Sequence, residues 1–404
     1  MIYQIGQLAD IIDGDRGKKY PKQNEFFPEG YCLFLNAGNV TPNGFSFEEN
    51  SFITQEKDDL LRKGKLQRGD IVYTTRGTVG NAALYSESVP FENIRINSGM
   101  VILRCHEDIV DKQYLYQVLK SEHFRPYFKK YCTGSAQPQL PIINFSKIEL
   151  NIPEMATQRR IADILSAYDD LIESNRKQIK LLEEAAQRLY KEWFVDLLFP
   201  GHEHTKIVDG VPEGWGIFRF SDKVKIMSGG TPKTDNSNYY GGEIPFYTPK
   251  DSGGAFFAFQ TETNITEEGL DNCNSHLYLE NTIIITARGT VGKTTLLAVP
   301  MAMNQSCYAL KSDEINAPYY LFFALNQEII ALRTMSNGGV FNTIVVKTFD
   351  RIHIRIPPDN LIQRFENMVT PVMELIKAKT KENFALSEAR DRLLPELMSG
   401  EVEV

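Results

Sequence analysis

The most specific chemical pattern in the chain is Ala287–Thr294, which reads A-R-G-T-V-G-K-T. With Ala in place of the first Gly, it fits a relaxed phosphate-binding loop, in which backbone amides and a lysine hold phosphates. The preceding residues, NTIIIT, are typical of the strand that leads into such a loop. Nucleotide binding is therefore the first hypothesis to test.

A second copy of the motif argues against nucleotide binding. The pattern T-x-R-G-T-V-G-x-x-x-L occurs at Thr74–Leu84 and again at Thr286–Leu296. The first copy has Asn81 and Ala82 where a phosphate-binding loop needs Lys and Ser or Thr. Pro300 also follows the second copy too closely for the helix that such a loop requires. The two copies share a turn and not the nucleotide chemistry.

The shared R-G-T-V-G turn has two interpretations. Its glycines favour a structural turn, because glycine permits a positive φ or a close approach of backbone. Its polar side chains could instead face a ligand and reach phosphates or base edges. The candidates for DNA contact at the two turns are Arg76, Thr78, Arg288 and Lys293.

Two loops, one early in each repeat, interleave cations with aromatic residues. Such loops can neutralise phosphates and contact bases, and they are also compatible with ordinary solvated loops. The candidates for DNA contact in these loops are Arg16, Lys18, Lys19 and Tyr20 in the first and Lys233, Thr234, Tyr239 and Tyr240 in the second.

Patterns typical of catalysis or of metal binding are absent from the sequence. There is no N-P-P-Y or D-P-P-Y motif, no glycine-rich cofactor fingerprint and no G-x-S-x-G, and Pro358-Asp359 lacks the following Asp/Glu-x-Lys of a nuclease. His202 and His204 lie in a linker rich in Pro and Gly, which favours solvent-exposed histidines over a metal site. The five cysteines are scattered without C-x-x-C. We expect no catalytic residues, no metal and no cofactor in this chain.

Length and composition predict an ordinary soluble protein. The chain has 404 residues, 42% hydrophobic and 24% charged, which suits two or more domains. No apolar run approaches the roughly 18 residues that span a bilayer, so a cytoplasmic location is expected. The net charge of −8 is concentrated in residues 151–205 and 357–404, while residues 1–150 are neutral overall. Any polyanion should therefore meet the longer segments between the acidic ones.

The chain is an internal duplication. Besides the turn, Lys147–Pro153 (KIELNIP) matches Arg351–Pro357 (RIHIRIP), and Tyr114-Leu115 matches Tyr320-Leu321. A mixed domain followed by a long helix thus occurs twice. The predicted boundaries are a first domain at 1–152, a first helix at 153–199, a linker at 200–214, a second domain at 215–356, and a second helix with the C-terminal tail at 357–404.

The two long helices have apolar residues at alternating spacings of three and four, which is the pattern of a coiled-coil seam. We expect them to span Gln158–Val195, with Thr157 as the N-cap, and Leu361–Met398, with Pro395 bending or ending the last turn. A further helix is expected near Asp111–Lys130. The seam residues are Ile161, Leu165, Tyr168, Ile172, Asn175, Ile179, Leu182, Leu189 and Trp193, and Phe365, Val369, Val372, Ile376, Lys379, Asn383, Leu386, Leu393 and Leu397.

Polar residues interrupt both seams near their middles. A duplicated unit that closes on itself would place the helices antiparallel, so Asn175 should lie opposite the region of Lys379 and Asn383. The alternative is that these side chains face water where the helices splay apart. The predicted fold class is α+β: two pseudo-twofold-related mixed α/β domains rich in short strands, separated by two long helices that form an antiparallel coiled coil.

Several segments together resemble the specificity subunits of type I restriction–modification systems. The resemblance covers essentially the whole chain, although Glu154-Met155 stands where that family usually has Pro-Leu. The segments that carry it are Ile152-Pro153, Gln158–Ile161, Leu182–Ala185, Lys191–Val195, Pro212–Trp215, Gly229–Pro232, Ile244–Phe246 and Leu393–Gly400.

The resemblance implies a DNA-recognition subunit without catalysis of its own. Each domain would be a target-recognition domain that reads one half of a split, asymmetric double-stranded DNA sequence. The helices would set the distance between the halves and dock two methyltransferase subunits, which carry S-adenosylmethionine, with restriction–translocase subunits as further partners. The competing interpretation is a coiled-coil scaffold whose two domains bind protein, and the two cation-rich loops argue against it.

Overall fold

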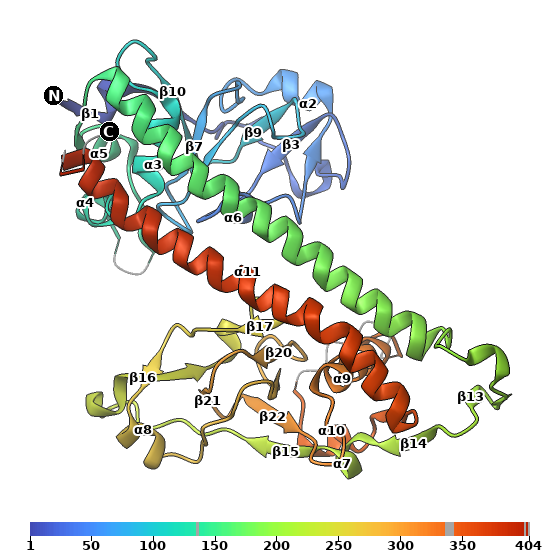
Figure 1. Cartoon of the computed structure of the whole chain (residues 1–404). Coiled ribbons are helices and arrows are strands. Elements are labelled where there is room, and N and C mark those ends of the chain that lie inside the picture. Colours follow the sequence, from blue (N-terminus) through green and yellow to red (C-terminus); the bar gives the residue numbers. More distant parts are fainter. Residues whose placement is uncertain (135–136, 336–342, 400, 403–404) are drawn as a thin grey trace. The chain divides into compact units, whose positions relative to one another are not determined.

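The computed structural model describes residues 1–134, 137–335, 343–399 and 401–402, and it forms two compact units (Figure 1). The first unit comprises Met1–Ser174 and Glu382–Val404, and the second comprises Asn175–Lys381. Each unit therefore combines one strand-rich segment with part of each long helix.

The first unit is built on two small sheets. Apolar β-branched runs such as IVYT are fully buried and form the central strands. The main sheet is antiparallel in the order β2 (Ala9–Asp13), β10 (Met100–Cys105), β7 (Ile71–Thr74), β8 (Ala82–Leu84). The second sheet has the order β6 (Phe52–Ile53), β3 (Cys32–Leu35), β9 (Ile94–Ile96), in which β3 and β9 are parallel. Short elements complete the unit: β1 (Ile2–Gln4) paired with β11 (Glu149–Asn151), β4 (Val40–Thr41) with β5 (Gly44–Phe45), and the helices α1 (Ile5–Leu8), α2 (Gln55–Leu60), α3 (Lys112–Lys120), α4 (Arg125–Tyr131) and α5 (Ile142–Phe145).

The second unit repeats this topology and adds one strand, β17 (Phe257–Ala258), to the main sheet. Its main sheet has the order β15 (Lys225–Ser228), β22 (Cys307–Lys311), β19 (Ile283–Thr286), β20 (Thr294–Leu297), β17. A second sheet, β18 (Asn264–Ile265), β16 (Tyr240–Tyr247), β21 (Ala302–Met303), again contains one parallel pair. The remaining elements are β14 (Gly216–Arg219) paired with β23 (His353–Ile356), the hairpin β12 (Ile207–Val208) and β13 (Val211–Pro212), and the helices α7 (Phe220–Lys223), α8 (Glu267–Asp271), α9 (Pro318–Met335) and α10 (Val346–Phe349). The duplication seen in the sequence thus extends to strand order.

Two long helices pass from one unit into the other. They are α6 (Met155–Tyr190), which continues as a π-helical turn over Lys191–Val195, and α11 (Asp359–Ser399). Within the second unit, Lys379 Nζ donates to Asn175 Oδ1 at 3.1 Å, and the rings of Trp193 and Phe365 lie 6.1 Å apart. Residue numbers that rise along α6 therefore meet numbers that fall along α11, so the helices are antiparallel.

The first unit contains the same antiparallel arrangement with a charged contact. Asp169 of α6 accepts hydrogen bonds from Gln117 Nε2 at 2.6 Å, from Lys120 Nζ and from Arg390 Nη1 of α11 at 2.7 Å. Toward the end of α11, Leu394 and Leu397 belong to the core of the first unit. All the predicted seam residues, Asn175, Lys379 and Asn383 included, are buried or half-buried.

Three helix predictions are corrected by the structure. Thr157 is not an N-cap, because α6 already begins at Met155, and the side chain of Gln158 ties this first turn to the backbone N–H of Asp111 at 2.8 Å. Of the two outcomes expected at Pro395, an end of the helix is wrong, because α11 continues to Ser399, and a bend there stays a prediction. The helix expected over Asp111–Lys130 is two helices, α3 and α4, and Pro126 lies in the first turn of the second.

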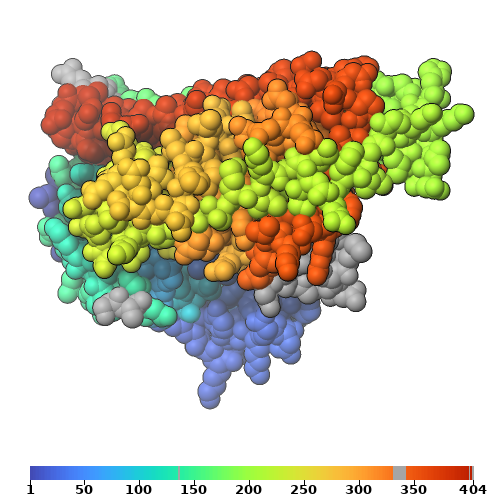
Figure 2. Space-filling model, turned by 90° about the horizontal axis from the view of Figure 1, so that it is seen from below, coloured from blue at the N-terminus to red at the C-terminus, as the bar shows by residue number. Residues whose placement is uncertain are grey.

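The linker after α6 is exposed along most of its length and lies within the lime-green part of Figure 2. His202 Nδ1 lies 2.9 Å from the carbonyl oxygen of Phe199. Among the described residues, no cluster of His, Cys, Asp and Glu could hold a metal ion. Within the same described residues, no helix is both long enough and apolar enough to cross a bilayer.

A buried carboxyl caps α9 from a neighbouring helix. Ala317, the residue before α9, has no hydrogen-bonding side chain. Glu366 of α11 accepts the backbone N–H groups of Tyr319 and Tyr320 instead, each at 3.1 Å. Burial raises the pKa of Glu366 to about 7, and the two hydrogen bonds lower it in part.

We predict that the Glu366→Gln variant removes a pH dependence of stability. The raised pKa means that the folded chain binds this proton more tightly than the unfolded chain. The contribution of Glu366 is therefore fully present below about pH 4.5 and is lost as the pH rises through about 7. The free energy of unfolding of the wild type should fall by about 3 kcal/mol relative to the variant over this range. Denaturant unfolding at several pH values measures the difference, with the exposed Glu268→Gln as control. Parallel pH profiles for the wild type and Glu366→Gln would contradict the prediction.

Candidate nucleic-acid interface

The two R-G-T-V-G turns are built identically around a buried threonine. The hydroxyl of Thr74 donates to the carbonyl oxygen of Thr78 and accepts the N–H of Asn81 at 2.9 Å. In the second unit the hydroxyl of Thr286 donates to the carbonyl oxygen of Thr290 and accepts the N–H of Lys293 at 3.0 Å.

The glycines of these turns have a structural role. Gly77 has φ +74° and Gly289 has φ +76°, a region that residues with a Cβ rarely adopt. The first interpretation of the motif, a structural turn, therefore holds for the glycines.

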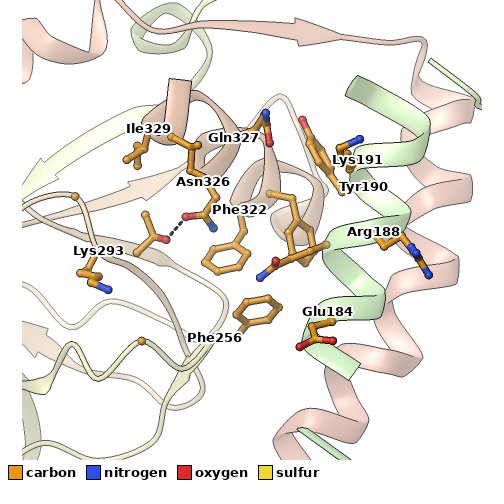
Figure 3. Close-up of a pocket in the computed structure, with 16 residues that line it drawn as sticks. Glu184, Arg188, Tyr190, Lys191, Phe256, Lys293, Phe322, Asn326, Gln327 and Ile329 are labelled. Atoms are coloured by element: carbon orange, nitrogen blue, oxygen red, sulfur yellow. Dashed lines mark hydrogen bonds between the residues drawn. The ribbon is translucent and has the colours of Figure 1, made fainter. Parts of the chain in front are cut away.

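The structure contradicts the nucleotide-binding hypothesis for the second turn. Thr294 begins the strand β20, so no helix N-terminus follows the turn to receive a phosphate. Gly292, Lys293 and Thr294 lie instead at the edge of a cavity of about 540 Å³ between α6 and α9. Figure 3 shows Lys293 apart from Phe256 and Phe322, which form an aromatic side of this cavity.

Both turns hold an exposed arginine. Arg76 and Arg288 lie at the turn tips, and within the described ranges of the chain no carboxylate pairs with either. Each turn is held by a backbone hydrogen bond to a second segment of its unit. The N–H of Thr75 donates to Gly99 O at 2.8 Å, and the N–H of Ala287 donates to Ser306 O at 2.7 Å. The arginines are thus presented by a rigid backbone.

No repeated motif indicated the segment that packs behind each turn. Asn97 Oδ1 accepts the N–H of Gly99 at 2.8 Å, and Asn304 Oδ1 accepts the N–H of Ser306 at 3.0 Å, so both segments are closed by the same asparagine turn. The available signal was short: I-N-S-G precedes β10, and M-N-Q-S precedes β22.

The cation-rich loops pack against the same segments. A Cβ on Gly14 would lie 2.3 Å from the carbonyl oxygen of Asn97, and a Cβ on Gly229 would lie 2.3 Å from that of Asn304. Only glycine permits this approach. Each unit therefore presents a three-segment face, which consists of Gly14–Tyr20, Thr75–Gly80 and Asn97–Gly99 in the first unit and of Gly229–Lys233, Ala287–Lys293 and Asn304–Ser306 in the second.

The structure brings some of the predicted contact residues together on these faces. Arg16 Nη2 donates to Ser98 O at 3.2 Å, and the N–H of Arg76 donates to the adjacent Gly99 O at 3.1 Å. Asp15, the acid within the first loop, accepts the N–H groups of Gly17 and Arg62. These two hydrogen bonds lower the pKa of Asp15, so its charge serves to anchor the loop. The exposed members of the predicted set are Arg16, Lys18, Lys19, Arg76, Thr78, Lys233, Thr234, Arg288 and Lys293.

The predicted tyrosines are packed within their own units. Tyr20 is half-buried with its ring edge-on to Phe34 at 5.6 Å, and burial raises the pKa of its phenol. Tyr240 donates to Pro232 O at 2.9 Å and packs in a small apolar cluster. Tyr239 is half-buried in a short 3-10 turn. These rings support the loops from within, whereas the cations around them face solvent.

Comparison with known proteins relates both units to one family. Residues 1–184 and 212–381 match the model of the type I restriction modification DNA specificity domain. The chain is 26% identical to the type I restriction enzyme HindI specificity subunit of Haemophilus influenzae, over 96% of this chain and 98% of that one. It is also 26% identical to the type I restriction enzyme MjaIX specificity subunit of Methanocaldococcus jannaschii, over 90% of this chain and 86% of that one.

A solved structure has the same fold. The crystal structure of the type I restriction–modification S subunit from M. genitalium superposes with a TM-score of 0.55 at 17% identity, over 98% of this chain and 95% of that one.

The close approach of the glycine loops generates a stability prediction. Gly14→Ala and Gly229→Ala should each destabilise the chain by about 1–3 kcal/mol, because the added methyl group meets a backbone carbonyl that cannot rotate away. Gly253→Ala is the matched control, since a Cβ there meets nothing within 4 Å. Thermal unfolding measures the effect. Equal melting temperatures for Gly14→Ala and Gly253→Ala would show that the loop yields freely.

Proposed function

Because the chain belongs to the type I restriction modification DNA specificity domain family, we propose that its two units read two different half-sites of one double-stranded DNA target. The role of such a subunit in a restriction–modification complex is DNA-target specificity and not catalysis. The proposal concerns how this chain divides that role between its units.

The observation that carries the proposal is the pair of three-segment faces. Their backbones are equivalent: Gly14 and Gly229 lie against the carbonyl oxygens of Asn97 and Asn304, and each asparagine closes the same kind of turn. Their exposed side chains differ at several positions, so the same backbone arrangement carries different hydrogen-bonding groups in the two units. Two such faces would read unlike half-sites, and the complete target would not be a palindrome.

The arginines shared by the two faces suit the DNA backbone. Arg76 and Arg288 occupy the same place in both units, and the feature common to two unlike half-sites is the phosphate backbone. Both side chains are exposed, and no described carboxylate neutralises them. We assign them to phosphates and leave sequence readout to the side chains that differ.

The long helices are proposed as the spacer between half-sites and as the docking surface for partners. The 36 residues of α6 span about 54 Å, more than the about 34 Å of one turn of DNA. The hydrogen bond between Asn175 and Lys379 would fix the register of this spacer. Residues 151–205 and 357–404 carry the densest negative charge and so suit protein better than DNA. Two methyltransferase subunits carrying S-adenosylmethionine, with restriction–translocase subunits in addition, are the proposed cytoplasmic partners.

Methylation sequencing of the source genome, with and without a deletion of this chain, tests the function. A split methylated motif with two unlike halves should be present in the wild type, absent in the deletion strain and restored by the intact chain. An unchanged set of methylated sites would favour the alternative, a protein-binding scaffold. A palindromic motif would contradict the assignment of different half-sites to the two units.

We predict that Arg76→Ala and Arg288→Ala weaken DNA binding without changing sequence preference. Each loss of a phosphate contact should reduce the slope of log affinity against log salt by about 1, equally for target and random DNA. Binding is measured with the chain in complex with its methyltransferase partner. Arg125→Ala is the control, since Arg125 is half-exposed, lies outside the face and pairs with Glu122 at 3.1 Å. A variant with an unchanged salt slope and altered base preference would overturn the assignment.

A further inference from the structure

The cation-rich loop and the segment that begins with Asn97 or Asn304 are joined by different side chains in the two units. Arg16 lies two residues after Gly14, and Thr231 lies two residues after the equivalent Gly229. Across from them, Ser98 and Gln305 each follow the asparagine of the asparagine turn. The two units therefore place unlike polar side chains at one equivalent pair of positions.

In the first unit this contact orients a guanidinium group. Arg16 Nη2 donates to Asp13 Oδ1 at 3.1 Å and to Ser98 O at 3.2 Å. The side chain remains 45% exposed. Both hydrogen bonds use Nη2, so the Nε and Nη1 donors have no acceptor among the described residues. A planar group with several fixed N–H donors is thus held at the surface.

In the second unit the same contact orients a carboxamide. The hydroxyl of Thr231 donates to Gln305 Oε1, and Gln305 is exposed. Its Nε2 keeps two N–H donors, and Oε1 keeps a second lone pair. The outward edge of Gln305 therefore offers one donor beside one acceptor.

These two edges match different bases in the major groove. Guanine presents two acceptors, O6 and N7, to which arginine donates a bidentate pair of hydrogen bonds. Adenine presents the N7 acceptor beside the N6 donor, which is the pattern that a glutamine amide complements. The DNA backbone offers no such distinction, so a contact that differs between the units suits base readout.

We propose that Arg16 contacts a guanine in one half-site, that Gln305 contacts an adenine in the other, and that these two residues determine specificity. The inference rests on the proposed function, in which each unit reads one half-site. Asp13 and Thr231 act through them as positioning residues, because each holds its planar group in one orientation.

Other side chains that differ between the faces fit this role less well. Asn81 is turned inward and donates to Val40 O at 2.8 Å. Lys293 takes the equivalent place in the second unit, but an ammonium on a flexible stem acts as a point charge and suits a phosphate. Lys18, Lys19 and Lys233 have the same chemistry. Arg16 and Gln305 combine a planar group, exposure and a partner that orients it.

The methylated motif produced by the complete complex tests the proposal base by base. Wild type, Arg16→Ala and Gln305→Ala are each produced with the methyltransferase partner, and the methylated sites are sequenced. The wild-type motif should contain a guanine in one half and an adenine in the other. Arg16→Ala should relax the guanine position alone, and Gln305→Ala the adenine position alone, with discrimination lost by roughly tenfold to a hundredfold.

Matched variants separate readout from folding. Arg125→Ala in the first unit and the exposed Gln260→Ala in the second should leave the motif unchanged. Thr231→Val keeps Gln305 and removes the hydroxyl that orients it, so it should weaken preference at the adenine position while the affinity for random DNA stays the same. Melting temperatures of all variants are compared with that of the wild type.

The outcomes distinguish this inference from the proposed function. If the wild-type motif is split but Arg16→Ala and Gln305→Ala leave it intact, the base assignments are wrong and the two-half-site function stands. Relaxation of both halves by one variant would also overturn the assignments. If no split motif depends on the chain, the proposed function itself fails.

Discussion

The carbonyl oxygens of Asn97 and Asn304 impose the constraint on which each three-segment face depends. Each oxygen lies only 2.3 Å from where a Cβ on the facing residue would be. Gly14 and Gly229, which have no Cβ, therefore allow each cation-rich loop to lie directly on the segment that holds the asparagine. The same segment accepts the backbone N–H at the base of the R-G-T-V-G turn. One close approach thus fixes three stretches of chain that are far apart in sequence, and the side chains on them have defined positions.

The duplication kept this backbone while the side chains diverged, on the helices as well as on the faces. In the first unit, Asp169 binds Gln117, Lys120 and Arg390 where α3, α6 and α11 meet. In the second unit, Phe323 and Asn326 of α9 stand in place of Gln117 and Lys120, at an offset of 206 residues. In the long helices, at an offset of 204, Met373 stands in place of Asp169 and Ala186 in place of Arg390. Three of these four belong to an apolar core. A charged contact of this kind requires every donor and acceptor to be matched, whereas the apolar version requires only complementary shape.

Under the proposed function, this separation of backbone from side chain would let one fold read two half-sites. The buried threonine hydroxyl and the positive-φ glycine of each turn are identical, because they determine where the chain goes. Arg16 and Thr231 differ, as do Ser98 and Gln305, although the backbone around these positions is equivalent. Under the proposed base assignments, change at such positions alters the bases read and leaves the fold intact.

The sequence by itself determined the features that depend on local pattern. The duplication, the turn at R-G-T-V-G, the two antiparallel helix seams and the resemblance to type I specificity subunits are all evident from residue type and spacing. These features rest on periodicity and on short motifs, which neighbours in sequence encode. Even the contact of Asn175 with Lys379 follows from where the polar residues interrupt each seam.

Only the tertiary structure decided which side chains meet on the two three-segment faces. The role of Asn97 and Asn304 depends on a loop more than 70 residues away, and no local pattern records that distance. Tyr20 and Tyr240 have the composition of a DNA-contacting loop, yet packing turns their rings inward. Arg16 is equivalent to Thr231, and Ser98 to Gln305, because of their positions relative to the contacts of Gly14 with Asn97 and of Gly229 with Asn304. Long-range backbone contacts, which a linear pattern does not specify, set those positions.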